Sequence, residues 1–424
     1  MKTQLPEEIA QSPSGQLADA ILRSCVHCGF CNAACPTYQL LGNELDGPRG
    51  RIYLIKQMLE GHPATRLTQT HLDRCLGCRS CETSCPSGVQ YAKLLAIGRE
   101  TLEPKLKRPA RERWLRGFLR WSLANPKRFR VMLRLGHQFR RYLPAMLKEH
   151  IPAQLPKPAA QDHWPKQQHK RHVIFLVGCV QPVMLPEVDL IAARVLDRLG
   201  ISVVHAGNTG CCGAASHHLT YTELSHQQIR NNIDEWWQLL VAGAEAIIST
   251  SSACTAMIKE YAHLMRDDPE YAQRASRVSG QTYDLSELLA RELAALTPDS
   301  HIPDAQRIAL HMPCSAQHGQ ALDGPIRDIL QKLGFVLAPV TDPHLCCGAA
   351  GTYSITQPAL ARQLRSNKLA GLHHGNPTCI ATANVGCQLF LQQESVTPVR
   401  HWIELVEARL TGASLDGLNT RLKP

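Results

Sequence analysis

Two groups of four cysteines near the start of the chain share the spacing C-x2-C-x2-C-x3-C-P. The first group ends before Pro36 and the second before Pro86. Three thiols spaced by two residues can surround one corner of a four-iron cube, whereas the fourth, turned away before a proline, binds the neighbouring cube. The spacing therefore predicts two [4Fe-4S] clusters, each with three ligands from one group and one from the other.

The predicted ligand sets follow from this exchange. The first cluster is bound by Cys25, Cys28, Cys31 and Cys85, and the second by Cys75, Cys78, Cys81 and Cys35. Zinc usually takes two C-x2-C pairs and has no use for a third cysteine two residues further on. A zinc site or plain buried cysteines therefore explain the spacing less well than two clusters do.

The segment between the two groups, 36–74, has a helical pattern of apolar residues. Helices at this position would shield the clusters from water, and burial is one of the ways in which a protein sets a cluster potential. Arg49 and Arg51 in this segment are candidates for hydrogen bonds to the cluster region or to a partner.

The C-terminal half contains a second cysteine repeat. Cys179, Cys211-Cys212-Gly213 and Cys254 recur as Cys314, Cys346-Cys347-Gly348 and Cys387, at offsets of 135, 135 and 133 residues. A repeat this regular indicates a duplicated domain. We call the two copies the first and the second CCG repeat.

Alternating strands and helices are expected to position these cysteines. Short buried strands are predicted at 171–179, 201–207 and 244–250, and again at 307–314, 335–340 and 378–384, with helices at 187–200 and 325–334. This alternation predicts a parallel α/β sheet in each repeat. The cysteines all fall at the carboxyl ends of the strands, where such sheets place their sites.

The predicted fold is α+β and multidomain. A helical two-cluster ferredoxin domain is expected at 1–104, a basic helical connector with a Pro-rich linker at 105–172, and two duplicated α/β CCG domains with parallel strands at 173–300 and 301–424. At 424 residues the chain is long enough for several cores.

Composition limits where the chain works and what it contacts. Seventeen cysteines, an odd number, together with a start that lacks the apolar core of a secretory signal, favour a reducing compartment. No apolar stretch is long enough for a membrane span. The net charge of +10 is uneven, because 105–148 contains fourteen basic residues and the single acid Glu112.

This basic connector predicts an anionic partner, either an acidic protein or a lipid surface. Nucleic acid is a third candidate, since aromatics alternate with arginines there. The aromatics also fall at helix-face spacing, which favours an amphipathic helix on a membrane surface. We therefore expect a peripheral membrane contact and no nucleic acid.

The motifs resemble those of a known family. The CCG pattern is similar to the cysteine-rich domain of heterodisulfide reductase B subunits and of iron–sulfur subunits from glycolate oxidase, lactate utilisation and anaerobic glycerol-3-phosphate dehydrogenase systems. The stretches "CVHCGFCNAACPTYQLLGNELDGPRGRIYLIKQ", "HLCCGAAGTYSITQPALARQLR" and "VRHWIELVE" are most similar to the glycolate oxidase iron–sulfur subunit family. The similarity covers nearly the whole chain and is least informative at 105–172.

The resemblance implies an electron-transfer subunit of a flavin-dependent complex that oxidises glycolate to glyoxylate. FAD would be bound by partner subunits, the acceptor would be the quinone pool, and the complex would lie on the cytoplasmic face of the inner membrane. This chain has no G-x-G-x-x-G after a strand, so it is not expected to bind a flavin or to oxidise the substrate by itself. Related complexes that oxidise lactate or glycerol-3-phosphate are the alternative.

One departure from the family pattern concerns the CCG repeats. The pattern ends in C-x-x-C, but Ser251 and Asn384 stand where the first of these thiols would be. A further iron–sulfur centre, held by Cys179, Cys211, Cys212 and Cys254 or by Cys314, Cys346, Cys347 and Cys387, stays open. The same departure disfavours a thiol–disulfide oxidoreductase of the heterodisulfide reductase type. His311 and His344, beside these sites, are interpreted as orienting or structural residues.

Overall fold

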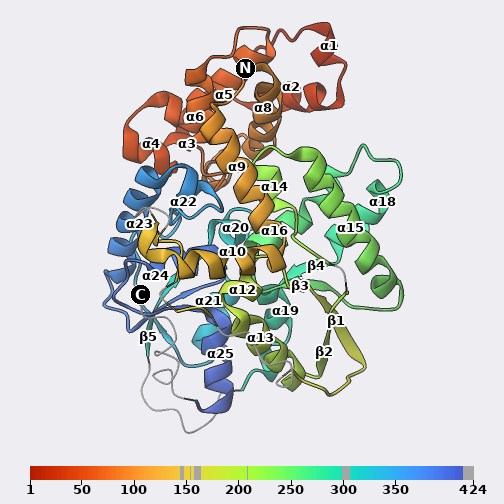
Figure 1. Ribbon diagram of the computed structural model, residues 1–424, viewed down its shortest axis with the longest axis vertical. Coiled ribbons are helices and arrows are strands. Elements are labelled where there is room, and N and C mark those ends of the chain that lie inside the picture. Colours follow the sequence, from red (N-terminus) through yellow and green to blue (C-terminus); the bar gives the residue numbers. More distant parts are fainter. Residues whose placement is uncertain (144–147, 153, 157–163, 208, 298–305, 414–424) are drawn as a thin grey trace.

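The computed structural model describes residues 1–143, 148–152, 154–156, 164–207, 209–297 and 306–413. A helical N-terminal region lies at one end of the molecule, and the two CCG repeats lie side by side below it (Figure 1). Parts of the predicted Pro-rich linker, the predicted boundary at 300/301 and the C-terminal end of the last predicted domain lie outside the described residues.

The N-terminal region is entirely helical. Its elements are α1 (Glu7–Ala10), α2 (Pro13–Ser24), α3 (Phe30–Ala33), α4 (Pro36–Leu41), η1 (Glu44–Asp46), α5 (Pro48–Leu59), α6 (Arg66–Asp73), α7 (Ser80–Thr83) and α8 (Tyr91–Lys105). Helix α2 begins where the Ser12 side chain accepts a hydrogen bond from the Gly15 N–H and proline occupies the first turn. One apolar core, with Leu22, Ile55 and Leu94 fully buried, joins α2, α5 and α8.

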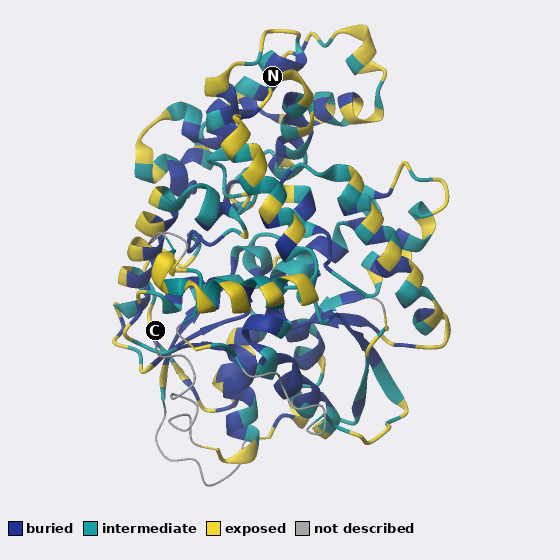
Figure 2. Cartoon of the chain, in the orientation of Figure 1, coloured by how far each residue is buried: buried dark blue, intermediate teal, exposed yellow. Residues whose placement is uncertain are grey.

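The connector consists of α9 (Ala110–Leu123), α10 (Pro126–Gln138) and η2 (Arg140–Tyr142). Leu119 and Leu133 are the buried apolar residues of these two helices, and exposed residues alternate with partly buried ones along the rest of both (Figure 2). Within the described residues, no helix combines the length and the apolar character needed to cross a bilayer.

The first CCG repeat is a parallel four-stranded sheet with the order β2-β1-β3-β4. Its elements are β1 (Arg171–Phe175), α12 (Gln181–Met184), α13 (Pro186–Arg198), β2 (Ile201–Val204), α14 (Ala214–His218), α15 (Thr222–Val241), β3 (Ile247–Ser249), α16 (Ser252–Lys259), α17 (Tyr261–Leu264), α18 (Ala272–Gly280), β4 (Thr282–Asp284), α19 (Leu285–Arg291) and η4 (Leu293–Ala295). The register pairs Arg171 with Ile201 and Ile174 with Ile247.

The second repeat has the equivalent parallel order, β6-β5-β7-β8. Its elements are β5 (Arg307–His311), α20 (Cys314–Gln317), α21 (Pro325–Lys332), β6 (Val336–Leu337), α22 (Tyr353–Thr356), α23 (Pro358–His373), β7 (Cys379–Thr382), α24 (Val385–Gln392), β8 (Val399–His401) and α25 (Trp402–Thr411). The register pairs Ile308 with Leu337 and with Cys379. The prediction of two duplicated α/β repeats with parallel strands is confirmed.

The two repeats share one core. Buried residues of α13 and α19 in the first repeat pack with those of α21 and α25 in the second, between the two sheets. The Ser252 N–H donates to the Ala383 carbonyl at 3.1 Å, and the Ser252 and Ser315 hydroxyls lie 2.7 Å apart. The segments that follow the third strand of each sheet, β3 and β7, are therefore close together.

Strands β4 and β8 were not predicted from the sequence. Each is three residues long, "TYD" and "VRH", and ends directly at a helix. A strand this short shows no period-2 alternation, and it forms because β3 or β7 beside it offers free hydrogen-bonding groups.

The shared core gives a prediction about stability. Leu405 on α25 is fully buried there. We therefore expect Leu405→Ala to lower the free energy of unfolding by about 2–5 kcal/mol, because the surrounding residues fill the resulting cavity only in part. Val396, 93% exposed, provides the control, and Val396→Ala should stay within about 0.5 kcal/mol of the parent. Thermal unfolding followed by circular dichroism measures both, and an unchanged midpoint for Leu405→Ala would contradict the shared core.

Candidate iron–sulfur centres

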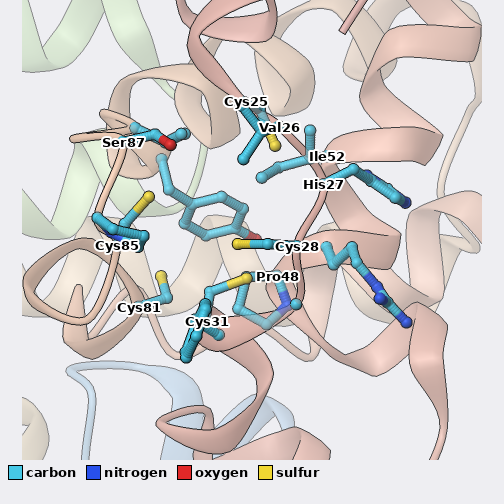
Figure 3. A pocket seen from close by; sticks show the side chains of 16 residues that line it. Cys25, Val26, His27, Cys28, Cys31, Pro48, Ile52, Cys81, Cys85 and Ser87 are labelled. Carbon is cyan, nitrogen blue, oxygen red and sulfur yellow. The ribbon is translucent and has the colours of Figure 1, made fainter.

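The first group of thiols surrounds a pocket in the N-terminal region. Cys25 and Cys28 line this pocket from the loop between α2 and α3, Cys31 lines it from α3 itself, and Cys85 lines it from the second group (Figure 3). The wall is otherwise mainly apolar, with Ile52 among its side chains. Four thiols from two distant segments therefore face one space, as a four-iron cube requires.

The backbone repeats along with the cysteine spacing. His27 and Gly77, at equivalent places in the two groups, have φ of 60° and 65°, and Gly29 and Arg79 have φ of 88° and 64°. One left-handed residue therefore lies between each pair of successive thiols among the first three of a group, where it turns the backbone. Arg79 adopts this conformation without being glycine, and ion pairs with Glu82 and Glu260 fix its side chain.

The fourth thiol of each group lies with the other group. Burial, followed by the nearby thiols Cys25, Cys85 and Cys28, raises the pKa of Cys31 to about 11. The pKa of Cys81 is also raised, first by burial and then by the nearby thiols Cys78, Cys75 and Cys35. Cys81 also lines the first pocket, so it lies between the two groups. The structure thus brings together both predicted sets.

A buried cation lies beside Cys35. Arg51 on α5 is 1% exposed, and its Nη1 is 3.9 Å from the Cys35 Sγ. The same guanidinium donates to the Thr37 hydroxyl at 3.1 Å and to the His71 carbonyl at 2.8 Å. Asp46, also 1% exposed, lies 3.7 Å from Arg51 and balances its charge. The expectation that Arg51 reaches the cluster region agrees with this geometry.

Cys75 has the most polar surroundings of its group. The Tyr91 hydroxyl donates to its Sγ at 3.6 Å, the Gly77 N–H donates to the same sulfur at 3.4 Å, and Arg99 donates to its carbonyl at 3.0 Å. Burial acts to raise the pKa of this thiol, but the charges of Arg51 and Arg99 lower it below the ordinary value. This position therefore favours a thiolate, the form that binds metal.

The second group faces the CCG repeats. The Tyr353 hydroxyl on α22 donates to the Arg74 carbonyl at 3.1 Å, and Thr83 lies 3.0 Å from the His318 ring. After burial, the neighbouring thiol Cys314 is the largest influence that raises the pKa of Cys78. The second group therefore lies against the cysteines of the second repeat.

The four cysteines of the first repeat converge at the carboxyl end of its sheet. The Cys179 thiol donates to the Cys211 sulfur at 3.5 Å, which lowers the pKa of Cys211. Cys212 contacts both Cys211 and Cys254. Gly213 has φ of 92°, a conformation that favours glycine and that turns the chain from the CCG loop into α14.

The four cysteines of the second repeat converge in the same way. The Cys314 and Cys346 sulfurs lie 4.0 Å apart, and thiol contacts continue from Cys346 to Cys347 and from Cys347 to Cys387. Gly348, the counterpart of Gly213, has φ of 90°, and a Cβ there would lie 2.7 Å from a backbone oxygen. Both predicted CCG sets are therefore brought together. At the position of the additional thiol in the family pattern, this chain has Ser251 in the first repeat and Asn384 in the second.

The Asn384 side chain has a structural role instead. The Asn384 side chain caps α24, accepting hydrogen bonds from the N–H groups of Gly386 and Cys387 at 2.8 and 3.4 Å. Ser251 begins α16, and its carbonyl accepts the Thr255 N–H at 3.1 Å.

A histidine joins the second set. Nitrogen and sulfur atoms of His311, Cys347 and Cys387 lie within 4.8 Å of one another, and all three residues are buried. His344, in contrast, accepts a hydrogen bond through its backbone carbonyl from His318 at 2.9 Å.

Sequence analysis missed several residues near the thiols. Tyr91, Arg99 and Asp46 touch the second group or its cation, and Tyr353 joins it to the second repeat. None of these residues belongs to a cysteine motif, so their contacts with the thiols become evident only in the folded structure. Helical periodicity at 91–105 would have identified α8 as the element that carries two of them.

Comparisons with known proteins assign both parts of the chain. Residues 21–89 match the 4Fe-4S dicluster domain, and residues 173–259 and 308–392 each match the cysteine-rich domain known as CCG. The first range contains both N-terminal cysteine groups, and the other two contain the CCG cysteines.

Alignments with two whole proteins cover more of the chain than the domain matches do. The glycolate oxidase iron-sulfur subunit of Escherichia coli (strain K12) is 52% identical over 411 residues, which are 97% of this chain and 99% of that protein. The probable glycolate oxidase iron-sulfur subunit of Bacillus subtilis (strain 168) is 30% identical over 87% of this chain and 88% of its own. Lactate utilization protein A of Shouchella clausii (strain KSM-K16) is 28% identical over 51% of this chain and 88% of its own.

The cation beside Cys35 gives a prediction. Arg51→Gln removes the buried guanidinium beside the Cys35 sulfur, while Asp46 keeps its ion pair with Arg74 at 2.9 Å. We expect iron in protein purified without oxygen to fall from about eight to about four per chain. Arg23→Gln is the control, because Arg23 is largely exposed and pairs with Asp19 away from both thiol sets. Equal iron in both variants would mean that Arg51 does not support the second group.

Proposed function

This chain belongs to the family of glycolate oxidase iron–sulfur subunits, and on that basis we propose that it takes electrons from a flavin-bearing partner and delivers them to an acceptor at the membrane. The resemblance found in its motifs is confirmed. As a subunit of a glycolate oxidase complex, it transfers electrons through iron–sulfur clusters. The observation that carries the proposal is the pair of thiol sets that exchange one member each.

The ligand assignment is part of the proposal. Cys25, Cys28, Cys31 and Cys85 bind one [4Fe-4S] cluster, and Cys75, Cys78, Cys81 and Cys35 bind the other. The pocket lined by the first set, and the mutual influence of the thiols in each set on their pKa values, support it. Bound there, the clusters supply one-electron redox chemistry at fixed positions.

The side on which electrons enter follows from exposure. Cys28 is the exposed member of the first set, and Val26 and Phe30 beside it are 69% and 66% exposed. Tyr53 on α5, 47% exposed, continues this apolar surface. Large apolar side chains around a redox site suit a protein partner. The flavin-bearing subunit, which would oxidise glycolate to glyoxylate and release two electrons and two protons, is proposed to dock here.

The membrane side follows from the connector. Trp114, Trp121 and Tyr142 are exposed by 69%, 44% and 69%, and the Arg128 and Arg141 guanidinium groups lie over the Trp121 and Tyr142 rings at 5.5 and 4.6 Å. Aromatic and basic side chains together suit the headgroup layer of an anionic membrane. This surface would hold the complex on the cytoplasmic face of the inner membrane, within reach of quinone as acceptor.

Two members of the basic connector have a different role. Arg116 pairs with Asp73 at 3.1 Å, and Arg108 pairs with the same carboxylate at 2.5 Å. These two cations tie the connector to α6. Burial acts to raise the pKa of Asp73, but the Arg108 and Arg116 guanidinium groups lower it below its ordinary value. Membrane contact is therefore assigned to the exposed arginines without an ion pair among the described residues, such as Arg111, Arg113, Arg128 and Arg134.

Electron transfer is tested by removing one ligand. Cys28→Ala should leave the partner flavin reducible by glycolate, because the substrate does not contact this chain, while turnover with an artificial quinone falls at least a hundredfold. Stopped-flow flavin absorbance and steady-state assays on the whole complex separate the two steps. Cys379→Ala is the control, because Cys379 is a buried strand residue outside both sets. Normal turnover in Cys28→Ala would refute the proposed role of the first set.

Membrane contact is tested with vesicles. Each basic side chain near an anionic surface contributes roughly 1 kcal/mol, so Gln at Arg111, Arg113, Arg128 and Arg134 should weaken sedimentation with phosphatidylglycerol vesicles about a hundredfold or more. Added salt should weaken the parent as well. The control, Gln at Arg307 and Arg327, changes exposed arginines elsewhere. Unchanged sedimentation of the quadruple variant, or equal binding to neutral vesicles, would contradict the proposal.

A further inference from the structure

His311 is a buried side chain without a partner. It ends strand β5, is 1% exposed, and neither ring nitrogen has a hydrogen-bond partner among the described residues. Leaving a buried polar group unpaired costs about 1–3 kcal/mol, so the two orphaned nitrogens require an explanation. The sulfurs of Cys347 and Cys387 lie within 4.8 Å of one of these nitrogens.

We propose that the second CCG repeat binds a single Zn²⁺ ion through His311, Cys347 and Cys387, with Cys346 as the fourth ligand. This assignment replaces the interpretation of His311 as an orienting residue. In the second repeat, the zinc ion takes the place of the further iron–sulfur centre that the sequence analysis left open.

The spacing of the donors favours one ion. Zn–S bonds are about 2.3 Å and Zn–N bonds about 2.0–2.1 Å, so two donors in a tetrahedral site lie roughly 3.3–3.8 Å apart. The three donors already lie within 4.8 Å of one another, and the Cys346 sulfur contacts that of Cys347. A cube instead holds its four cysteines on four separate irons. A compact set of soft sulfurs and one imidazole is the donor chemistry of zinc.

Only the second repeat has this set. The offset of 135 residues that relates Cys314 to Cys179 places Leu176 at the position of His311. Leu176 is 1% exposed and offers no ligand. The histidine therefore supplies a nitrogen donor in the repeat whose Asn384 side chain is occupied in capping α24.

A buried lysine compensates the charge of the site. Three thiolates and one Zn²⁺ carry a net charge of −1. Lys368 on α23 is 4% exposed, and the thiols Cys347, Cys346 and Cys387 act on its ammonium group. That ammonium donates to the Asp342 and Pro343 carbonyls at 3.0 Å, which fixes it beside the CCG loop. The same offset places the apolar residue Ile233 at this position in the first repeat.

The first measurement needs no substitution. The full chain, purified without oxygen and with its iron retained, should contain about one zinc besides about eight irons. Zinc K-edge absorption should show three sulfurs and one imidazole nitrogen. A chain without zinc, a chain with appreciably more than eight irons, or a zinc with sulfur ligands only would overturn the proposal.

Variants then locate the ion. His311→Leu, which reproduces Leu176 of the first repeat, should lose at least nine-tenths of the zinc and keep its iron. Cys387→Ala should do the same. The matched control Cys254→Ala removes the counterpart of Cys387 in the first repeat and should keep the zinc.

Two results with the variants would contradict the assignment. Full zinc in His311→Leu would exclude the histidine as a ligand, and zinc loss in Cys254→Ala with retention in Cys387→Ala would move the ion to the first repeat. If His311→Leu also lost iron through unfolding, the absorption spectrum of the parent chain would still decide the ligand set.

Discussion

Buried sulfur demands buried positive charge, and much of this structure follows from that constraint. Thiolates that converge away from water repel one another, and each is costly to bury unless a cation lies nearby. Arg51 meets this need beside Cys35, Arg99 beside Cys75, and Lys368 beside Cys347. Metal provides the remainder of the charge. The arginines have ordered partners of their own, so the protein positions the cations before any metal is bound.

The parallel sheets explain why distant cysteines meet. In each repeat the first strand of the sequence lies inside the sheet, with the second strand on one side and the third on the other. The connections after the first and the third strand therefore run in opposite directions. In open parallel sheets, the carboxyl ends of two such strands form the usual binding site. Cys179 and Cys254 in one repeat, and Cys314 and Cys387 in the other, follow these two strands.

Much of this arrangement could be predicted from spacing. C-x2-C-x2-C-x3-C-P fixed which thiols belong together before any fold was known, because so short a segment can place its side chains in few ways. The duplication at an offset of 135 residues predicted both sheets and where their cysteines lie. The prediction of two parallel sheets is confirmed, and the thiols that the spacing groups together lie close to one another, because both depend on a repeated local geometry.

Other features depend on contacts between segments far apart in the sequence. Tyr353 joins the second cysteine group to the second repeat across 279 residues, and no local pattern marks it. His311 was interpreted as an orienting residue because one histidine beside a strand end is usually satisfied by a neighbour. Its two unpartnered nitrogens become visible only when every surrounding group is placed. Strands β4 and β8 are too short for their period to be read.

The different surroundings of the two thiol groups give the N-terminal region a direction. The first group has an exposed cysteine and apolar side chains that face outward, whereas the second lies against the cysteines of the second repeat. A partner can therefore approach the first group directly, whereas the second group is partly covered by the second CCG repeat. In the proposed assignment each cluster takes one thiol from the other group, so the two groups could not move apart without losing ligands. The exchanged pair of cysteines would then fix both the distance between the two redox centres and the order in which a partner meets them.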